Sequence, residues 1–251
     1  MDLNSDLGEG FGSWQMGDDA ALLGVVTSAN IACGFHAGDP ATMRRTVGMA
    51  IERGISIGAH VAYPDLRGFG RRHVDLPQEE VAADVLYQIG ALEALARAAG
   101  GSVDYVKPHG ALYNQMMVDA ELAQTVVSAI LSFQETLPLL ALPGSVAQRV
   151  AQQAGLPCYG EGFADRAYEP DGRLVSRSRP GAVLHDPAQV AARALRMVCE
   201  GTVVTIDGSV LALDVATICV HGDSPGAVEM ALAVRATMQD AGVELARFVA
   251  A

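Results

Sequence analysis

The histidines are the residues of this chain best suited to chemistry. Four of the six directly follow or end short apolar runs, namely His36, His60, His109 and His221. An imidazole titrates near neutral pH and is a common metal ligand, so such side chains suit proton transfer or metal binding. A lone histidine can equally be a structural group. Four at equivalent positions favour a shared pocket, whereas His73 and His185 fall in expected surface loops.

Carboxylates accompany these histidines. An aspartate from the first apolar run, together with His60 and His109, would make a site of one carboxylate and two histidines with open positions, as a catalytic divalent metal needs. The alternative is acid–base catalysis without a metal, performed by Asp6, Glu9 or the histidines. The spacing of these residues leaves both chemistries open.

Lys107 is the only lysine of the chain, which otherwise uses arginine. A lysine ammonium is a compact charge whose pKa falls on burial, which distinguishes it from arginine. At the end of an apolar run and beside His109, Lys107 is expected to meet a carboxylate or a developing negative charge. The structural alternative is a buried ion pair with an acid at another strand end, because a buried charge needs a partner.

Further polar residues follow the same runs. The catalytic candidates are Asp6, Glu9, His36, Lys107 and His221, and the substrate-binding candidates are Asn4, Tyr113, Asn114, Asp165, Arg166 and Asp223. Aspartates in such places also serve as helix N-caps or loop anchors, so Asp223 has both interpretations. We expect these side chains to converge only if the strands that precede them share one edge of the fold.

Seven short apolar runs are expected to be the strands that position these side chains, and they cover residues 1–5, 27–33, 54–61, 103–107, 138–142, 156–160 and 215–220. Most are interpreted as apolar on both sides of the pleat, as in parallel strands buried on both faces. Between them, apolar residues repeat at helical spacing, as in Met43, Val47 and Ile51. The carboxyl ends of parallel strands carry the active sites of such folds.

Several element boundaries are also legible. Helices are expected to begin at Asp39-Pro40, Asp186-Pro187 and Ser224-Pro225, where an N-cap side chain precedes a proline. A two-residue hairpin turn is expected at Asp207-Gly208. Repeated strand and helix units favour one parallel β/α barrel, an α/β protein with a single domain over residues 1–251, above an open doubly wound sheet.

Composition excludes several classes of protein. Half of the residues are hydrophobic, so we expect a folded chain, and no apolar run reaches the roughly 18 residues that cross a bilayer. A net charge of −12 argues against nucleic-acid or anionic-membrane partners. Dispersed cysteines predict no disulfide framework, and acidic residues near the N-terminus predict no signal peptide. A cytoplasmic protein with a small-molecule substrate is expected.

The stretches that contain these residues resemble the LamB/YcsF family. They are DLNSDLGE at 2–9, SANIACGFHAGDP at 28–40, GFGRR at 68–72, VKPHGALYN at 106–114, EGFADR at 161–166 and ICVHGD at 218–223. The similarity is collinear from residue 2 to the C-terminal helix, and the long motifs are jointly specific. One departure is Val61-Ala62, where the family usually has Pro-Ser.

That family is the A subunit of prokaryotic 5-oxoprolinase. The resemblance implies a distorted seven-stranded parallel β/α barrel, similar to that of glycoside hydrolases and polysaccharide deacetylases. It implies ATP-dependent hydrolysis of a cyclic amide, 5-oxoproline (pyroglutamate), to L-glutamate together with partner subunits B and C. Related barrel hydrolases hold a divalent metal with a first-strand aspartate and two histidines, which by position are Asp6, His60 and His109 here. The resemblance leaves the identity of such a metal open.

Two other functions stay open. One is a stand-alone metal-dependent hydrolase of an N-acyl or carbohydrate substrate, which would act without ATP or partners. The other is a non-catalytic scaffold that binds a carboxylate ligand, although many ionisable groups at one rim argue against it. No ATP-binding motif is legible, so either the barrel loops hold the nucleotide in an uncommon way or partner subunits supply part of its site.

Overall fold

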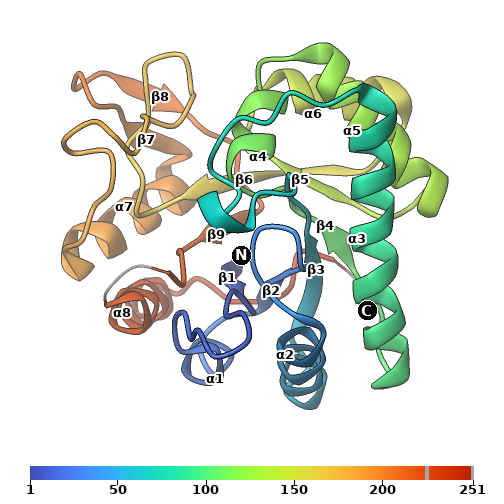
Figure 1. The fold of residues 1–251 in the computed structure, drawn as a ribbon. Helices are drawn as coiled ribbons and strands as arrows, with labels where there is room; N and C mark the ends of the chain where they lie inside the picture. The colour runs from blue at the N-terminus through green and yellow to red at the C-terminus, as the bar shows by residue number, and fades with distance from the viewer. Residues whose placement is uncertain (224–225, 250–251) are drawn as a thin grey trace.

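Seven parallel strands close into a barrel in the computed structural model, which describes residues 1–223 and 226–249 (Figure 1). The strands are β1 Asp2–Leu7, β2 Ser28–Ala32, β3 Ser56–His60, β4 Tyr105–Val106, β5 Leu139–Ala141, β6 Cys158–Phe163 and β9 Thr217–Cys219. Neighbours pair in that order, and β9 closes the barrel between β6 and β1. The expected seven-stranded parallel barrel is confirmed, and each expected apolar run overlaps one barrel strand.

The inner face of the barrel is polar. Asn4 donates to Thr217 Oγ1 at 2.7 Å, and Asn30 donates to Asn4 Oδ1 at 2.7 Å. Tyr105 reaches from β4 and donates its hydroxyl to Asn30 at 2.7 Å. Residues at the alternate positions, such as Leu3, belong to the hydrophobic core. The expectation of strands apolar on both sides is therefore wrong, because hydrogen bonds across the barrel give its buried polar groups their partners.

Helices surround the barrel (Figure 1). They are α1 Asp19–Leu22, α2 Pro40–Glu52, α3 Gln78–Ala98, α4 Gly110–Met116, α5 Ala120–Phe133, α6 Val146–Ala154, α7 Pro187–Glu200 and α8 Ala227–Asp240. The predicted N-caps Asp39 and Asp186 accept hydrogen bonds from the first turns of α2 and α7. The third expected start, Ser224-Pro225, lies outside the described residues.

No single helix among the described residues is long and apolar enough to cross a bilayer. The bent pair of α4 and α5, with 114° between the two helices, passes by length and composition.

One segment departs from the barrel. Residues 164–186 link β6 to α7, and the antiparallel hairpin of β7 Thr202–Val204 and β8 Val210–Ala212 lies beside them (Figure 1). Arg193 on α7 donates to the carbonyl oxygens of Arg166 at 2.9 Å and Val204 at 3.1 Å, and so joins the two parts. The predicted hairpin is present, but its two-residue turn is wrong. Residues 205–209 separate the strands, because Asp207 accepts from Thr205 and folds a longer turn.

Contacts of the C-terminal segment close the amino end of the barrel. The ring centroid of Phe248 lies 5.0 Å from that of Tyr105 and 5.1 Å from that of Tyr159. The amino group of Met1 donates to the carbonyl oxygen of Glu244 at 2.8 Å. A ligand must therefore enter from the opposite, carboxyl end.

Candidate active site

A cavity of about 690 Å³ opens at the carboxyl end of the barrel. Eight of the thirteen predicted residues line it, namely Asp6, His60, Lys107, His109, Tyr113, Asn114, Arg166 and His221. The other five do not line this cavity, and they are Asn4, Glu9, His36, Asp165 and Asp223. Residues remote in the sequence thus meet at one rim because parallel strands end there together.

Lys107 occupies the centre of the cavity floor. Its Nζ lies 2.9 Å from Asp6 Oδ1, 2.8 Å from Glu161 Oε1 and 3.1 Å from Cys219 Sγ. Burial alone would lower the pKa of Lys107, but Asp6, Cys219 and Glu161 outweigh it and raise that pKa well above its ordinary value. Lys107 is therefore a permanent cation that also faces the cavity. Glu161 is not among the predicted site residues. The need of a buried lysine for a carboxylate partner is the signal that could have identified it.

Asp6 links this ion pair to two histidines. Its Oδ1 accepts from Asn30 at 2.8 Å as well as from Lys107, and its Oδ2 lies 3.4 Å from His60 Nε2 and 4.0 Å from His221 Nε2. Burial would raise the pKa of Asp6, but His60 and Lys107 outweigh it and hold that pKa well below its usual value. An ionised carboxylate of this kind is a weak base and acts mainly through its charge.

His221 is oriented by a buried aspartate. Its Nδ1 lies 2.8 Å from Asp165 Oδ2, while its Nε2 is directed toward Asp6. Burial would raise the pKa of Asp165, but the interaction with His221 lowers it. The carboxylate therefore holds a proton on Nδ1 and leaves Nε2 free to accept one, which is how a general base is commonly prepared.

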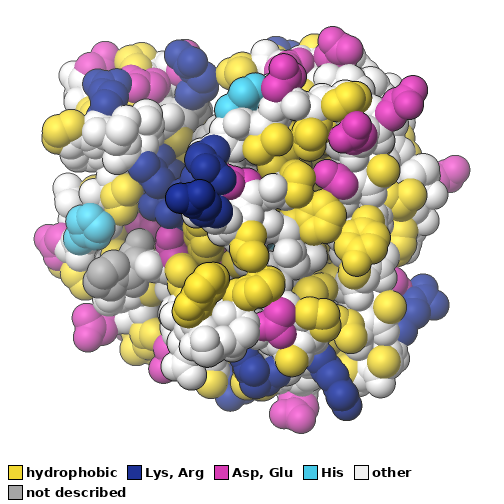
Figure 2. All heavy atoms as spheres, viewed as in Figure 1, with side chains coloured by type: hydrophobic (Ala, Val, Ile, Leu, Met, Phe, Trp, Pro, Cys, Tyr) yellow, Lys and Arg dark blue, Asp and Glu magenta, His cyan; other side chains and the backbone are white. Residues whose placement is uncertain are grey.

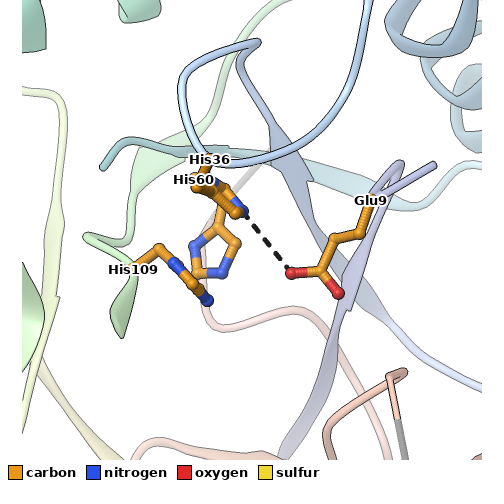
Figure 3. Close-up of side chains that lie close together, drawn as sticks. All are labelled: Glu9, His36, His60 and His109. Carbon is orange, nitrogen blue, oxygen red and sulfur yellow. Dashed lines mark ion pairs between the residues drawn. The ribbon is translucent and has the colours of Figure 1, made fainter. Parts of the chain in front are cut away.

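Three further histidines and Glu9 form a cluster beside the cavity (Figure 3). The rings of His36 and His109 stack with centroids 3.9 Å apart, and that of His60 lies 5.3 Å from His36. Glu9 Oε1 points at His36 Nε2 from 3.5 Å. One ligand atom from each of the four lies within 4.8 Å of the others, and no side chain is more than 5% exposed.

This cluster is short of hydrogen bonds. Glu9 Oε1, both ring nitrogens of His36, His60 Nε2 and His109 Nδ1 have no hydrogen-bond partner in the part of the chain that the structure describes. Leaving such a buried atom without a partner costs about 1–3 kcal/mol. Burial and the other histidines hold the pKa values of His36 and His109 well below their usual value, so both rings are neutral.

The four donor groups fit a transition-metal ion better than the predicted set does. Neutral imidazoles and a carboxylate are suitable ligands. The set predicted from the sequence is Asp6, His60 and His109, and Asp6 accepts a hydrogen bond from Lys107. In the cluster, Glu9 supplies the carboxylate and His36 adds a third imidazole.

A short loop covers the cluster. Phe69 has a positive φ of 55° and packs edge-on against His36 and His109, with centroids 5.6 and 5.4 Å apart. A Cβ on Gly70 would lie 2.7 Å from His109 Nδ1. Arg71 bonds to Asp223 at 2.5 Å and lies over the Phe69 ring. This loop separates the histidines from solvent.

Arginines gather at the mouth of the cavity. Six basic side chains line it against two acidic ones, and the basic ones are Arg71, Lys107, Arg166, Arg173, Arg177 and Arg179. Figure 2 shows the resulting group of Lys and Arg side chains near the middle of this face. Only Lys107 and Arg166 among them are predicted from the sequence as site residues, although four arginines between residues 166 and 179 are a visible signal in an acidic chain.

Arg166 is the buried member of this group. It is 5% exposed and donates to the carbonyl oxygens of Val175 and Ala182 at 2.6 and 3.2 Å. Burial and the charge of Arg177 lower the pKa of Arg166 to about 10. Neither Arg166 nor Arg177 forms an ion pair with a carboxylate among the described residues. Two neighbouring positive charges of this kind favour the binding of an anion.

The remaining predicted residues have supporting positions. Asn4 lies below the cavity floor, where its Oδ1 is 3.4 Å from Lys107 Nζ. Asn114 donates to the carbonyl oxygen of Gly110 at 2.8 Å, within its own helix. The Tyr113 hydroxyl is buried in the cavity wall, and burial together with the charge of Glu161 raises the pKa of Tyr113 well above its usual value.

Fold and site together define a parallel β/α barrel with acid, base and cationic groups at its carboxyl rim. A family model for the LamB/YcsF family matches residues 1–251. The chain belongs to the LamB/YcsF family.

Named relatives match over nearly the whole chain. The chain is 58% identical to the 5-oxoprolinase A subunit of Paracidovorax citrulli over 99% of both proteins. It is 56% identical to the third 5-oxoprolinase A subunit of Pseudomonas syringae pv. tomato, over 99% of this chain and 97% of that one.

Solved structures match the fold. The lactam utilization protein from Thermus thermophilus is 47% identical, with a TM-score of 0.93 over 98% of both chains. A protein from Enterococcus faecalis named for cellobiose-phosphate cleavage is 15% identical, with a TM-score of 0.59 over 98% of this chain and 96% of that one, and shares the fold alone.

Proposed function

We propose that this chain is the A subunit of an ATP-dependent 5-oxoprolinase, which opens the lactam of 5-oxoproline to L-glutamate together with the B and C subunits. The names of the relatives and of the Thermus thermophilus structure support this role. The observation that carries the proposal is the cavity itself, which joins a proton-accepting His221–Asp165 pair to a group of cations.

The substrate chemistry calls for such a cavity. 5-Oxoproline carries a carboxylate, and its ring amide is a poor electrophile because of resonance. Transfer of the ATP γ-phosphoryl group to the amide oxygen would activate the ring carbon, and the transferred group carries further negative charge. The site must therefore bind at least two anionic groups, and the arginines at the mouth and Lys107 supply the positive charge.

We assign the following steps to this chain's residues. His221 Nε2 takes a proton as a water attacks the activated carbon, and Asp165 stabilises the resulting imidazolium. The ring C–N bond breaks and its nitrogen takes the proton back from His221 Nε2, which leaves an acyl phosphate. A second water releases phosphate and glutamate. Lys107 stabilises the oxygen that becomes negative, while Asp6 and Glu161 hold the ammonium in place.

Glutamate release from 5-oxoproline tests the proposal. The assembled enzyme with ATP should release glutamate, and His221→Gln or Asp6→Asn should abolish most of that activity. The exposed His185→Gln is the matched control. Normal turnover by both site variants would refute the assignment of the site.

The runner-up function makes the opposite prediction. A stand-alone metal-dependent hydrolase would cleave an N-acyl or carbohydrate substrate without ATP and without partners, and it would lose that activity on chelation. The Glu9–histidine cluster is the observation that favours this function. Assay of the chain alone against N-acyl amino acids and acetylated sugars, with and without a chelator, distinguishes the two functions.

A further inference from the structure

We propose that Glu9, His36, His60 and His109 bind one divalent transition-metal ion. This site goes beyond the proposed lactam chemistry, none of whose steps uses it. The four side chains come from four segments of the barrel rim, after β1, after β2, at the end of β3 and after β4 (Figure 3).

The hydrogen-bond deficit of the cluster is the main argument. Each of the four contributes a buried donor or acceptor atom that lacks a partner among residues 1–223 and 226–249. Each of the four also offers one ligand atom that lies within 4.8 Å of those of the other three. Buried polar atoms in folded proteins nearly always have a partner. A single cation could bind to all four side chains at once, whereas a histidine in a protein core normally has a hydrogen-bond partner of its own.

The orientation of His60 supports metal binding. Its Nδ1 lies 2.9 Å from the carbonyl oxygen of Lys107, so Nδ1 donates its proton there, and Nε2 has no hydrogen-bond partner among the described residues, with Asp6 Oδ2 3.4 Å away. Metal-binding histidines usually donate their second N–H to a carbonyl or carboxylate in this way. The backbone at Lys107 therefore fixes the tautomer that a metal ion needs.

The type of ligand selects the type of ion. Three imidazole nitrogens and one carboxylate suit Zn²⁺ and its neighbours in the first transition row, while Mg²⁺ and Ca²⁺ prefer oxygen ligands throughout. We therefore expect zinc or cobalt to bind and magnesium to bind far more weakly.

A second group of ligand types lies nearby and is less suited to an ion. Asp6, Cys219 and His221 also offer atoms within 4.8 Å of one another. The ammonium of Lys107 already lies 2.9 Å from Asp6 Oδ1 and 3.1 Å from Cys219 Sγ. A metal ion there would face a like charge at short range, so the cluster with Glu9 is the favoured site.

The proposed ion borders the cavity without lying in its mouth. His60 and His109 line the cavity, while Phe69 and Gly70 cover the rings of His36 and His109. The site is thus closed by protein on the side of the loop and adjoins the substrate pocket on the other.

Metal uptake by the full-length chain tests the proposal. After removal of metals with a chelator, the protein should take up about one Zn²⁺ or Co²⁺ per chain, with visible Co²⁺ bands from protein ligands. Glu9→Gln and His36→Gln should each weaken zinc binding by more than about 100-fold, beyond the loss caused by a supporting residue. The exposed histidines provide matched controls, and His73→Gln and His185→Gln should bind zinc as the wild type does.

Two measurements guard against variants that fail to fold. Zinc should raise the melting temperature of the wild type and of the controls, and X-ray absorption of the zinc-loaded wild type should show about three imidazole ligands. Failure of the stripped wild type to bind zinc, or unchanged binding by both Glu9→Gln and His36→Gln, would overturn the proposal. Loss of binding only in His221→Gln would place the ion in the other group and would also overturn it. None of these measurements uses 5-oxoproline, so they succeed or fail independently of the proposed function.

Discussion

Lys107 meets several chemical demands with one side chain. It is 2% exposed and lies between the carboxylates of Asp6 and Glu161, with the thiol of Cys219 beside it. Lysine suits this place better than arginine, because a compact ammonium can approach acceptors from three directions while a guanidinium is a planar fork. The same ion pair that keeps the lysine charged gives the cavity floor a fixed cation for catalysis.

Removal of this cation should destabilise the protein. We expect Lys107→Met to lower the free energy of unfolding by about 3–5 kcal/mol at neutral pH, because it leaves buried carboxylates without their partner. Urea unfolding followed by circular dichroism measures the change. Arg97→Met is the control, because Arg97 is largely exposed in its ion pair with Glu93, and it should change stability by less than about 1 kcal/mol.

The pH dependence of that loss gives a sharper test. In the wild type the pKa of Asp6 is held well below 3.8, so its contribution to stability is present above that value and is lost as pH falls through the lowered pKa. Without Lys107, burial raises the carboxyl pKa, so the variant loses stability as pH rises. The difference between the two proteins should therefore grow from about pH 4 to about pH 8. A constant difference over that range would contradict the ion-pair account.

Asp165 has a separate role at the residue scale, because it orients His221 rather than contacting substrate. Asp165→Asn should lower kcat by about 100- to 10,000-fold in the assembled enzyme, since the amide favours the wrong tautomer of the imidazole. KM should change little. Asp171→Asn is the control, because Asp171 is an exposed loop residue. An equal fall in both variants would show that the role of Asp165 is not specific.

At the scale of elements, the sequence predicts the features that depend on neighbouring residues, namely strands and helix starts. Apolar runs locate the seven strands, and Asp39 and Asp186 locate two helix starts, because strand burial and N-capping depend on neighbouring residues. The sequence predicts that Lys107 meets a carboxylate but does not identify Glu161 as its partner, since barrel closure brings the two together from distant strands. The arginine-bearing segment 164–186 has no periodicity that would place it over the cavity.

At Val61-Ala62, contacts with helix α3 take the place of the proline that usually fixes this loop in the family. The backbone N–H and C=O of Ala62 are both bonded to the side-chain amide of Gln88 on α3, at 2.8 and 2.9 Å. The carbonyl of Val61 accepts from the backbone N–H of His109 at 2.7 Å. These bonds fix the loop after β3 without the usual proline, and they keep His60 and His109 in register.

The loop over the histidine cluster should tolerate no side chain at Gly70. A Cβ there would lie 2.7 Å from His109 Nδ1 and from His36 Cβ, and the backbone has a positive φ of 62°. We expect Gly70→Ala to cost about 1–3 kcal/mol of stability, because the added methyl group would displace His109. Gly48→Ala, in the middle of α2 with open space around it, should instead stabilise by about 0.5–1 kcal/mol. Thermal unfolding of the two variants provides the comparison, and a stabilising Gly70→Ala would refute the close packing of the loop.

At the scale of the whole molecule, charge is distributed unevenly. The chain has a net charge of −12, yet six basic and two acidic side chains line the cavity. Such a contrast concentrates positive potential at the mouth of the barrel and repels anions from the rest of the surface. Arg71 lines this mouth, donates to Asp223 and lies over the ring of Phe69 in the loop that covers the histidines. The entrance of the cavity is therefore in direct contact with that loop.

This distribution predicts how binding depends on Arg177 and on salt. Arg177→Gln should raise KM for the anionic substrates of the assembled enzyme by about 10-fold or more, because it removes a charge-assisted hydrogen bond. The fall of kcat/KM with ionic strength should be shallower than in the wild type, since one charge fewer attracts the substrate. Arg44→Gln on α2 makes the same change in net charge at an exposed position that does not line the cavity, and it should leave both quantities unchanged. Equal effects of the two substitutions would mean that net charge, rather than the arrangement of cations around this barrel mouth, governs substrate capture.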